Sequence, residues 1–260
     1  MLGTSSLLGA DRRVLVIGGT GFVGGAVIDA LLEANAQVTA MVPYGKGPLL
    51  GAAGGSLRVV EADVWNRGSL RGHGRGQDVV IHLVGSLQQR PERGKTYHHL
   101  NVASLQNTAR MAVEDGVKLM IFLSAAGAPW LRGEYVQSKR EAERYLQRSG
   151  IRWTVVRSPL VYPRGRLLNP LLIMSAIAGG IPLLGWPFVR WAPLPVDVLA
   201  RGLAELALGE PWINRTVYGR QIRQLSRAYL ARRTSGPLTG HAAGNTALDI
   251  EEEPPFGWLP

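Results

Sequence analysis

The 260-residue sequence predicts an α/β fold, a doubly wound parallel sheet with helices on both faces. Short apolar runs that suit buried strands alternate with stretches of helical periodicity, which is the pattern of βαβ units with right-handed crossovers. Near the start, the aliphatic run 14–17 leads into Gly18, Gly21 and Gly24 and then into apolar residues at helical spacing. Strand, tight glycine turn and helix in this order predict a Rossmann-type core, followed by a small C-terminal lobe.

The other elements follow in chain order, with bounds set by apolar runs and by the Gly or Pro residues around them. Strands are predicted at 14–17, 37–42, 57–61, 78–84, 118–123, 152–156 and 216–218. Helices are predicted after the glycine turn and at about 96–115, 134–148, 196–208 and 221–232. After Pro159 the composition turns rich in Pro, Leu and Trp, and this change marks the start of the lobe.

The glycine turn is a candidate phosphate site. Gly18 permits a turn that a Cβ would block, Gly21 lets a backbone N–H approach a pyrophosphate, and Gly24 lets the helix lie close to the strand. The free N–H groups and partial positive charge of a helix N-terminus suit an anion. The alternative is a structural turn with no ligand. We favour a dinucleotide, because the glycines stand between a buried strand and a helix.

We therefore divide the chain into four parts. Residues 1–11 are a flexible N-terminus, and 12–158 form the dinucleotide-binding core. Residues 159–233 form a lobe for a substrate or partner, interleaved with the core, and 234–260 form a tail rich in Gly, Pro, Thr and acids.

Composition narrows the possible functions. The absence of cysteine excludes disulfides, thiol catalysis and cysteine zinc sites, and the five histidines form no metal-binding pattern, so we expect no metal. The net charge of +10 is carried mostly by arginine, with only four lysines. Basic and aromatic residues do not interleave as in nucleic-acid modules, so we expect no nucleic acid partner. A solvated basic surface accounts for the charge, with attraction to anionic lipid heads as the alternative.

Residues 167–189 form an apolar segment with no charge over 23 positions, which is long enough to cross a bilayer. Pro170, Gly179 and Pro182 instead favour a helix at about 170–178, a turn and an apolar loop. This segment is a candidate contact with a protein partner or a membrane surface. Because 1–11 carry no signal-peptide pattern, we expect a cytoplasmic protein, with peripheral membrane contact as a further possibility.

Three residues suggest catalytic chemistry. Ser124 is predicted just past the end of the fifth strand, where it could hold a substrate carbonyl or hydroxyl. Tyr135 and Lys139 lie one turn apart on the same face of the following helix. A lysine ammonium near a phenol favours the phenolate and lowers the phenol pKa toward use as a general acid or base. The alternative is a packed tyrosine and a solvated lysine.

Seven segments carry a family resemblance: GGTGFVG at 18–24, EADV at 61–64, VIHLVG at 80–85, FLSAAGA at 122–128, YVQSKREAE at 135–143, VVRSPLVYPRG at 155–165 and PVDVLARGLAELAL at 195–208. Together they resemble the short-chain dehydrogenase/reductase superfamily, of the extended or atypical type. The segments also follow one another in the same order as in that family. Within it the chain is most similar to the branch of the NAD(P)H-binding accessory subunit of respiratory complex I. The nitrogen-regulator-type NADP sensors are a neighbouring branch.

The resemblance implies a role for each matching position. Around the pyrophosphate it implies Gly18, Thr20, Gly21, Phe22, Val23 and Gly24. It implies Asp63 and Val64 at the adenine, and Leu83, Val84 and Gly85 beside the adenosine ribose and the nicotinamide. It implies Tyr135 and Lys139 at the nicotinamide ribose, and Pro159, Leu160 and Val161 at the nicotinamide amide. The implied catalytic residues are Ser124, Tyr135 and Lys139. Asn101 falls where the family often has an asparagine, and a purely structural role fits it equally well.

The segment after the second strand departs from the family. Val42 and Pro43 stand where an acid would bind the adenosine ribose, and no Asp or Glu lies between Val42 and Gly55. This argues against strong NAD selectivity. The arginine common in NADP-binding relatives is also missing, so Lys46 or an arginine from elsewhere in the chain would have to bind a 2′-phosphate. We expect NADP(H) to bind at least as well as NAD(H).

Three functions remain open. The first is an NAD(P)-dependent oxidoreductase or epimerase acting on a small carbonyl or alcohol, which the Ser-Tyr-Lys set favours. The second is an NADPH-binding accessory subunit or assembly factor of a membrane redox complex, without turnover, which the apolar segment and the charge favour. The third is a redox-sensing regulator. The region between Pro159 and Thr234, about 75 residues, is short for a large nucleotide-sugar substrate.

Overall fold

The computed structural model describes residues 12–50, 55–163 and 192–234, apart from 87, 90, 92, 93, 95, 129, 130, 132 and 211. Its strands are β1 (Arg13–Ile17), β2 (Gln37–Val42), β3 (Leu57–Glu61), β4 (Val79–His82), β5 (Leu119–Ala125), β6 (Trp153–Ser158), β7 (Val161–Tyr162), β8 (Leu194–Pro195) and β9 (Arg215–Tyr218). Its α-helices are α1 (Phe22–Glu33), α2 (Arg67–Leu70), α3 (Ser104–Glu114), α4 (Gly133–Arg148), α7 (Val196–Leu208) and α8 (Gly219–Thr234). A 3₁₀ turn, η1 (Gly47–Leu50), follows β2, and a π-helical turn, η3 (His98–Ala103), precedes α3.

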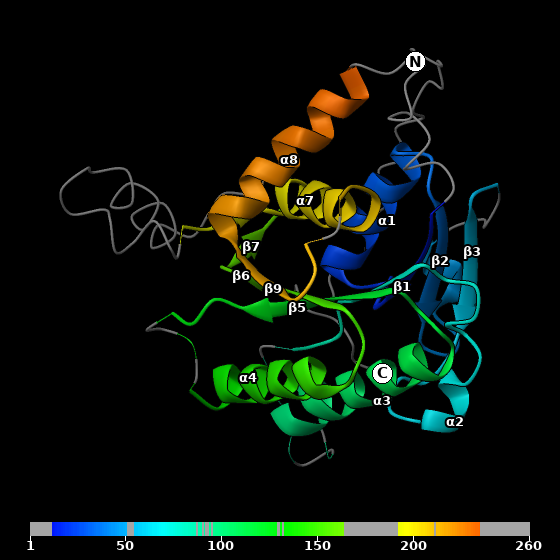
Figure 1. The fold of residues 1–260 in the computed structure, drawn as a ribbon. Coiled ribbons are helices and arrows are strands. Elements are labelled where there is room, and N and C mark those ends of the chain that lie inside the picture. Colours follow the sequence, from blue (N-terminus) through cyan, green and yellow to red (C-terminus); the bar gives the residue numbers. More distant parts are fainter. Residues whose placement is uncertain are drawn as a thin grey trace.

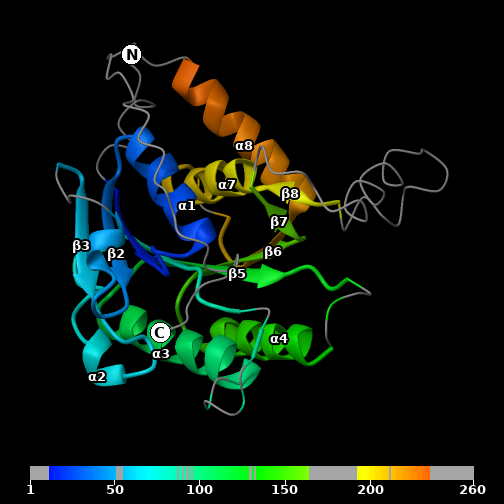
Figure 2. The same cartoon turned by 180° about the vertical axis from the view of Figure 1, so that it is seen from behind.

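The main sheet has seven strands in the order β3-β2-β1-β4-β5-β6-β9, and every neighbouring pair is parallel. Helices α1, α7 and α8 cover one face, and α2, α3 and α4 cover the other (Figures 1 and 2). The predicted doubly wound parallel sheet is therefore confirmed. The strand order reverses between β1 and β4, and in folds of this kind ligands bind at the carboxyl ends of the strands beside that point.

A separate apolar core lies on each face of the sheet. Along β1, Val14 and Val16 belong to the core beneath α1 and α7, whereas Leu15 and Ile17 belong to the core beneath α3 and α4. Side chains alternate along a strand, so a central strand that is apolar at every position can fill both cores. This explains why residues 14–17 read as one continuous aliphatic run.

The start of α1 lies against the turn that precedes it. A Cβ added to Gly24 would stand 2.1 Å from the carbonyl oxygen of Gly18, so only glycine fits this approach. Gly18 itself has a φ of +96°, which favours glycine. In turn, α7 packs on α1 and α8 packs on α7, so the whole face shown at the top of Figure 1 is built on this contact.

Several predicted bounds were wrong. Strand β5 continues through Ala125, so Ser124 lies inside the strand and not past its end. Strand β4 is shorter than predicted, at four residues. The long helix predicted from residue 96 is a π-helical turn followed by α3. The short elements η1, α2, β7 and β8 were not predicted, because so few residues carry no readable periodicity.

The C-terminal described residues share the layers of the core. Strand β9 extends the main sheet next to β6, and only the short pair β7 and β8 stands apart from it. The domain division predicted at residue 159 stays a prediction. Residues 1–11, the apolar segment 167–189 with its predicted helix, and the tail beyond 234 lie outside the described residues. No helix in the described part is long and apolar enough to cross a membrane.

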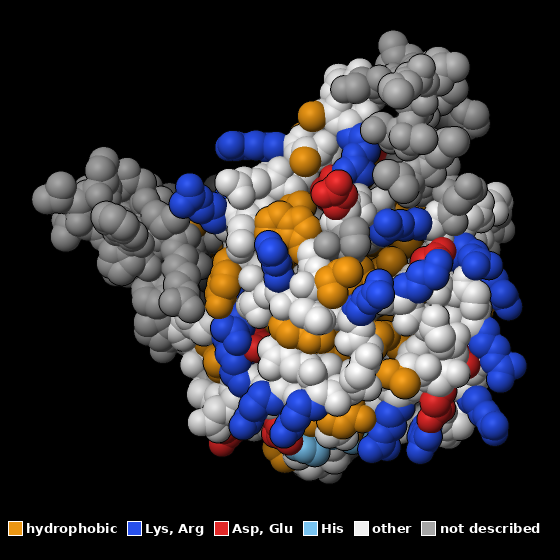
Figure 3. All heavy atoms as spheres, viewed as in Figure 1, with side chains coloured by type: hydrophobic (Ala, Val, Ile, Leu, Met, Phe, Trp, Pro, Cys, Tyr) orange, Lys and Arg blue, Asp and Glu red, His pale blue; other side chains and the backbone are white. Residues whose placement is uncertain are grey.

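Basic side chains are spread widely over the face seen in Figure 3, with acidic side chains among them. Several arginines pair with acids on the surface, such as Arg67 with Glu114 and Arg233 with Glu33. On this face the positive charge is therefore distributed and solvated, as the composition suggests.

The Gly24 contact predicts opposite outcomes for two adjacent glycines. Gly24→Ala should lower the free energy of unfolding by about 1–3 kcal/mol, because the new methyl group forces α1 away from the turn. Gly25→Ala should raise it by roughly 0.5–1 kcal/mol, because nothing lies within 4 Å of the added Cβ and alanine favours the helix. Urea unfolding of both variants measures the difference. Equal effects of the two substitutions would contradict the close approach.

Candidate functional site

The glycine turn leaves the N-terminus of α1 open. The backbone N–H groups of Gly18 and Gly19 donate to the Met41 carbonyl oxygen at 3.2 and 3.4 Å, which ties the turn to the end of β2. Gly21 is the N-cap of α1, and within the described residues no side chain caps its first turn. The free amides of a helix start attract anions. This geometry fits a pyrophosphate.

The segments after β2 and β3 lie at the same edge of the sheet. Lys46 lies in a turn after β2, in which its N–H donates to the Pro43 carbonyl oxygen at 3.1 Å. Asp63 follows β3, and its Oδ1 accepts from the Trp65 N–H at 2.9 Å. Val64 is fully buried. The structure thus brings Lys46 and Asp63 to the carboxyl ends of neighbouring strands, and their roles at the dinucleotide stay predictions.

The exit of β4 lies against η3 and α4 at Gly85. A Cβ added to Gly85 would lie 2.5 Å from the Lys139 Nζ and 2.7 Å from the Asn101 Oδ1. Lys139 is only 4% exposed, and its Nζ donates to the carbonyl oxygens of Leu123 at 3.2 Å and Val84 at 3.4 Å. Lysine, asparagine and the glycine backbone therefore meet at one point, between β4 and the start of α4.

Asn101 is fully buried, so it is not a helix-surface residue. Its Nδ2 donates to Ser138 Oγ at 3.0 Å, and Ser138 Oγ donates to the Tyr135 carbonyl oxygen at 2.8 Å. Its Oδ1 has no hydrogen-bond partner among the described residues. A buried acceptor without a partner is costly, and its position beside Lys139 fits a site that a ligand or water completes.

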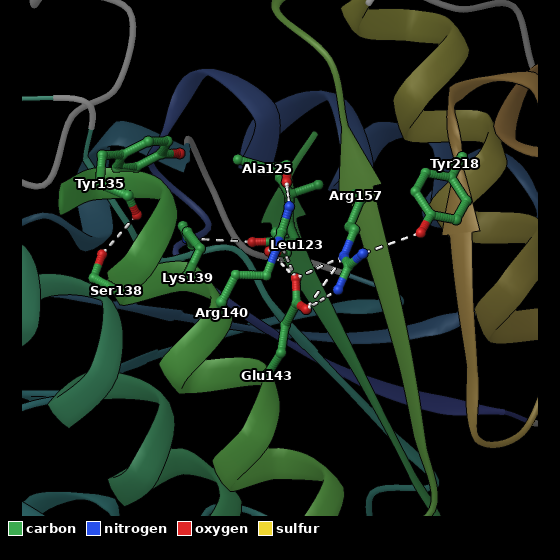
Figure 4. A network of polar contacts seen from close by, with 10 residues as sticks. Leu123, Ala125, Tyr135, Ser138, Lys139, Arg140, Glu143, Arg157 and Tyr218 are labelled. Atoms are coloured by element: carbon green, nitrogen blue, oxygen red, sulfur yellow. Dashed lines mark hydrogen bonds and ion pairs between the residues drawn. The ribbon is translucent and has the colours of Figure 1, made fainter. Parts of the chain in front are cut away.

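Tyr135 lies at the start of α4, above Lys139 in Figure 4. Its ring meets the ring of Tyr97 edge-on, with centroids 5.7 Å apart. Burial raises the pKa of the Tyr135 phenol, the neighbouring Tyr97 raises it further, and the charge of Arg140 lowers it. Burial lowers the pKa of Lys139 to about 7, against an opposing effect of the Glu143 carboxylate.

The predicted lowering of the Tyr135 pKa by Lys139 was therefore wrong for this structure. Burial disfavours the charged form of each group. It raises the pKa of the Tyr135 phenol and lowers the pKa of the Lys139 ammonium, so it disfavours an ammonium–phenolate pair. At neutral pH Tyr135 keeps its proton and a large part of Lys139 is uncharged. The helical spacing correctly predicted that the two side chains share a face, but spacing does not report burial.

Ser124 faces a different part of α4 from Tyr135. Its Oγ donates to Glu143 Oε1 at 2.5 Å and accepts from Arg140 Nη1 at 3.3 Å. Glu143 lies two helical turns beyond Tyr135, and Figure 4 shows the two at different levels of the helix. The structure gives the Ser124 hydroxyl a structural partner, and its role as a substrate clamp stays a prediction.

Glu143 is the centre of a buried ionic cluster that sequence reasoning missed. The carboxylate is 2% exposed and accepts from Arg140 at 2.5 Å and from Arg157 at 2.6 Å. Arg157 also donates to the Tyr218 hydroxyl at 3.0 Å, so the cluster joins α4, β6 and β9 (Figure 4). The hydrogen bonds and charge of Glu143 raise the pKa of Arg157. Only the i,i+3 pair of Arg140 and Glu143 was visible in the sequence.

The predicted nicotinamide border follows β6. Leu160 accepts a hydrogen bond from the Leu194 N–H at 2.8 Å, and Val161 pairs with Leu194 in the small sheet. Pro159 accepts from Ser158 Oγ at 3.0 Å. These residues lie at the carboxyl end of the main sheet, on the same edge as the glycine turn. No group of three His, Asp or Glu side chains in the described ranges is placed to hold a metal ion.

The fold and the glycine turn together define a dinucleotide-binding protein of the Rossmann class. Residues 18–164 match the family described as NAD(P)H-binding, and the chain belongs to this family. Its ligand class is therefore a nicotinamide dinucleotide. The open N-terminus of α1 is consistent with such a ligand, and so is the Asn101 Oδ1, which has no hydrogen-bond partner among the described residues.

A known epimerase is similar to part of the chain. It is 26% identical over 197 residues to the UDP-glucose 4-epimerase of Vibrio cholerae, over 66% of this chain and 58% of that protein. The chain thus covers less than two thirds of the length of that relative.

Solved structures agree on the fold. The enzyme WbmG of Bordetella bronchiseptica, solved with NAD, has a TM-score of 0.61 at 19% identity, over 91% of this chain and 83% of that chain. A dTDP-glucose 4,6-dehydratase from Streptomyces venezuelae, a double mutant with NAD bound, has a TM-score of 0.58 at 22% identity, over 85% and 80%.

The buried His82 makes stability depend on pH. His82 lies in β4 with its Nε2 3.4 Å from Ser104 Oγ, and burial and the charge of Lys139 lower its pKa from 6.5 to about 3. Between these values the unfolded chain binds a proton that the folded chain does not. The free energy of unfolding should therefore fall as pH drops from about 6.5 to about 3, by roughly 1.4 kcal/mol per pH unit from this group.

Urea unfolding across this pH range tests the prediction. In His82→Gln the slope should become shallower by that amount, because the amide cannot take up a proton. His73→Gln removes a histidine outside the core and serves as the control, while the carboxyl groups contribute equally in all three proteins. An unchanged slope in His82→Gln would show that this histidine is not held neutral.

Proposed function

We propose that the protein is an NAD(P)-dependent oxidoreductase or epimerase that acts on a small carbonyl or alcohol substrate. One observation carries the proposal: a buried Lys139, one helical turn from Tyr135, meets Gly85 and Asn101 at the carboxyl end of β4. Burying a lysine at the ligand-binding edge of the sheet costs free energy of folding, and a residue with a purely structural role would not require a charged group there. The relatives with epimerase and dehydratase activity support the same class.

The residues assigned to the dinucleotide are those that the family resemblance implies. The first-turn amides of α1, with Gly18, Thr20, Gly21, Phe22, Val23 and Gly24, would hold the pyrophosphate. Asp63 and Val64 would meet the adenine, and Lys46 would meet a 2′-phosphate. Leu83, Val84 and Gly85 would lie beside the adenosine ribose and the nicotinamide. The nicotinamide ribose would contact Tyr135 and Lys139, and the nicotinamide amide would border Pro159, Leu160 and Val161. A bound nicotinamide dinucleotide would supply hydride-transfer chemistry at this site.

Tyr135 is the proposed proton donor or acceptor. Because its pKa is raised, the phenol is protonated at neutral pH, which suits donation to a substrate carbonyl oxygen. Lys139, with a pKa of about 7, can exchange protons near neutral pH and contact the ribose. Ser124 can serve as a substrate clamp only if its hydroxyl turns away from Glu143.

One observation favours a second candidate function. A serine hydroxyl held by Glu143 suits a protein that binds a dinucleotide without turnover. This would be an NADPH-binding accessory subunit or assembly factor of a membrane redox complex, or a redox-sensing regulator. A partner or membrane contact would then involve residues 167–189.

Replacing Gly21 tests the cofactor assignment. Gly21 has φ −73° and ψ 161°, which a valine can adopt, so Gly21→Val introduces a side chain without backbone strain. We expect it to abolish binding of NAD and NADP, because the side chain occupies the place of the pyrophosphate. Gly133→Val, at the start of α4, is the matched control and should bind normally. Unchanged titration calorimetry with Gly21→Val would refute the assignment.

Replacing Tyr135 distinguishes the two candidate functions. Tyr135→Phe keeps the ring and loses only the hydroxyl, so the hydride-transfer rate should fall about 10²- to 10⁴-fold while cofactor affinity is nearly unchanged. Tyr145→Phe, on the same helix, is the control, because its hydroxyl accepts only a surface bond from Arg110. Lys139→Ala should reduce both rate and affinity.

The assays cover a panel of carbonyls, quinones and alcohols, together with complementation of a deletion strain. Full complementation by Tyr135→Phe would exclude the enzyme proposal. A cofactor-binding protein without turnover would then be the better account.

A further inference from the structure

The carboxyl end of β2 lacks the acid that such folds use to bind the adenosine ribose. Val42, the last residue of β2, is fully buried, and Pro43 follows it. In dinucleotide-binding folds an Asp or Glu at this point accepts hydrogen bonds from the ribose hydroxyls and selects NAD. On this ground the sequence predicted binding of NADP at least as strong as that of NAD.

An acid reaches this place from the neighbouring strand. Glu61 is the last residue of β3, and its Cα pairs with that of Val42 across the parallel ladder. Its Oε1 accepts from the Gly47 N–H at 3.0 Å, and Gly47 begins the 3₁₀ turn that follows β2. The exposed side chain of Glu61 therefore extends over the loop after β2 and not away from it.

Glycine at position 47 is part of this arrangement. A Cβ added to Gly47 would lie 2.8 Å from the Glu61 Oε1, so a larger residue would push the carboxylate aside. The contact spans 14 positions of the chain. It places the carboxylate beside the end of β2, at the carboxyl edge of the sheet.

The proposed pyrophosphate site lies next to this edge. Gly18 and Gly19 both donate to the carbonyl oxygen of Met41, the residue before Val42. In folds of this kind, a dinucleotide bound at the N-terminus of α1 would have its adenosine ribose over the end of β2. Adjacent strands are separated by only about 4.8 Å, so the end of β3 is within reach of that ribose.

We propose that Glu61 supplies the missing acid, binds the adenosine ribose hydroxyls and makes NAD the preferred dinucleotide. The inference rests on the proposed cofactor site at the glycine turn. One carboxylate has about four lone-pair sites, so Glu61 can accept from Gly47 and from the ribose together. A 2′-phosphate in the same place would put two negative groups in contact, which disfavours NADP.

Glu61→Gln is the test variant, because it removes the charge and keeps an oxygen that accepts from Gly47. Glu33→Gln is the matched control: it makes the same charge change at the last residue of α1, where Glu33 pairs with Arg233. The 12-residue helix separates that position from the pyrophosphate by about 18 Å. Titration calorimetry of the full chain with NAD⁺ and NADP⁺, at about 0.15 M salt to limit unspecific attraction to the basic surface, measures the affinities.

We expect the unaltered protein to bind NAD⁺ at least about tenfold more tightly than NADP⁺. Glu61→Gln should weaken NAD⁺ binding about tenfold, corresponding to about 1.4 kcal/mol, and leave NADP⁺ binding equal or tighter. Glu33→Gln should leave the ratio unchanged. Glu61→Lys should reverse the preference, since its ammonium would attract the 2′-phosphate.

Two results would overturn the inference while leaving the cofactor site intact. One is tighter binding of NADP⁺ than of NAD⁺ to the unaltered protein, with that preference lost in Lys46→Ala. The other is an unchanged ratio in Glu61→Gln. Failure of both dinucleotides to bind the unaltered protein would overturn this inference and the proposed function together, so the two failures are distinguishable.

Discussion

The approach of α1 to the glycine turn is the constraint on which most of the structure depends. With the Gly18 carbonyl oxygen 2.1 Å from where a Gly24 Cβ would stand, the start of α1 is held directly above the end of β1. Helix α7 packs on α1 and α8 on α7, so one entire face of the sheet is positioned by that contact. The same contact presents the open helix N-terminus at the carboxyl edge, where the fold binds ligands. Core packing and the phosphate site therefore have one common origin.

The opposite face depends on a charge rather than on a close contact. A carboxylate as buried as that of Glu143 is stable only with charged partners, and Arg140 and Arg157 provide them from α4 and β6. Removal of one partner would leave an uncompensated charge in the core, so the cluster fixes α4 against β5 and β6. Because Tyr135 and Lys139 lie on that helix, the cluster also sets their height above the sheet. The same cluster also engages the Ser124 hydroxyl, which donates to Glu143.

What could be predicted from the sequence is what local periodicity encodes. The strands 37–42 and 57–61 and the helix 196–208 were predicted with their observed bounds, because apolar runs and flanking Gly or Pro residues mark them. The shared face of Tyr135 and Lys139 follows from a spacing of four. The direction of the Tyr135 pKa shift does not, because it depends on burial by residues such as Tyr97.

The features that were missed all join segments far apart in the chain. Arg157 meets Glu143 across 14 positions and Tyr218 across 61, and neither separation is a period of a helix or strand. The contact of Glu61 with Gly47 is of the same kind: no acid lies between Val42 and Gly55 in the sequence, whereas the parallel register places residue 61 beside residue 42. Register between parallel strands is a tertiary property, since the crossover that connects them can vary in length.

Among the described residues, two of the buried side-chain atoms without a hydrogen-bond partner lie around Lys139, whereas Gln77 Oε1 lies before β4. His82 Nδ1 and Asn101 Oδ1 are both buried without a hydrogen-bond partner in the described residues. Asn101 and Lys139 both border Gly85, and the charge of Lys139 lowers the His82 pKa. A core selected for stability alone would replace such groups with apolar ones, as it does along β1. By contrast, the equally buried Glu143 has every charge compensated. Two buried polar regions on one helix thus serve different ends: the satisfied one holds α4 in place, and the unsatisfied one is the region where a ligand can supply the missing partners.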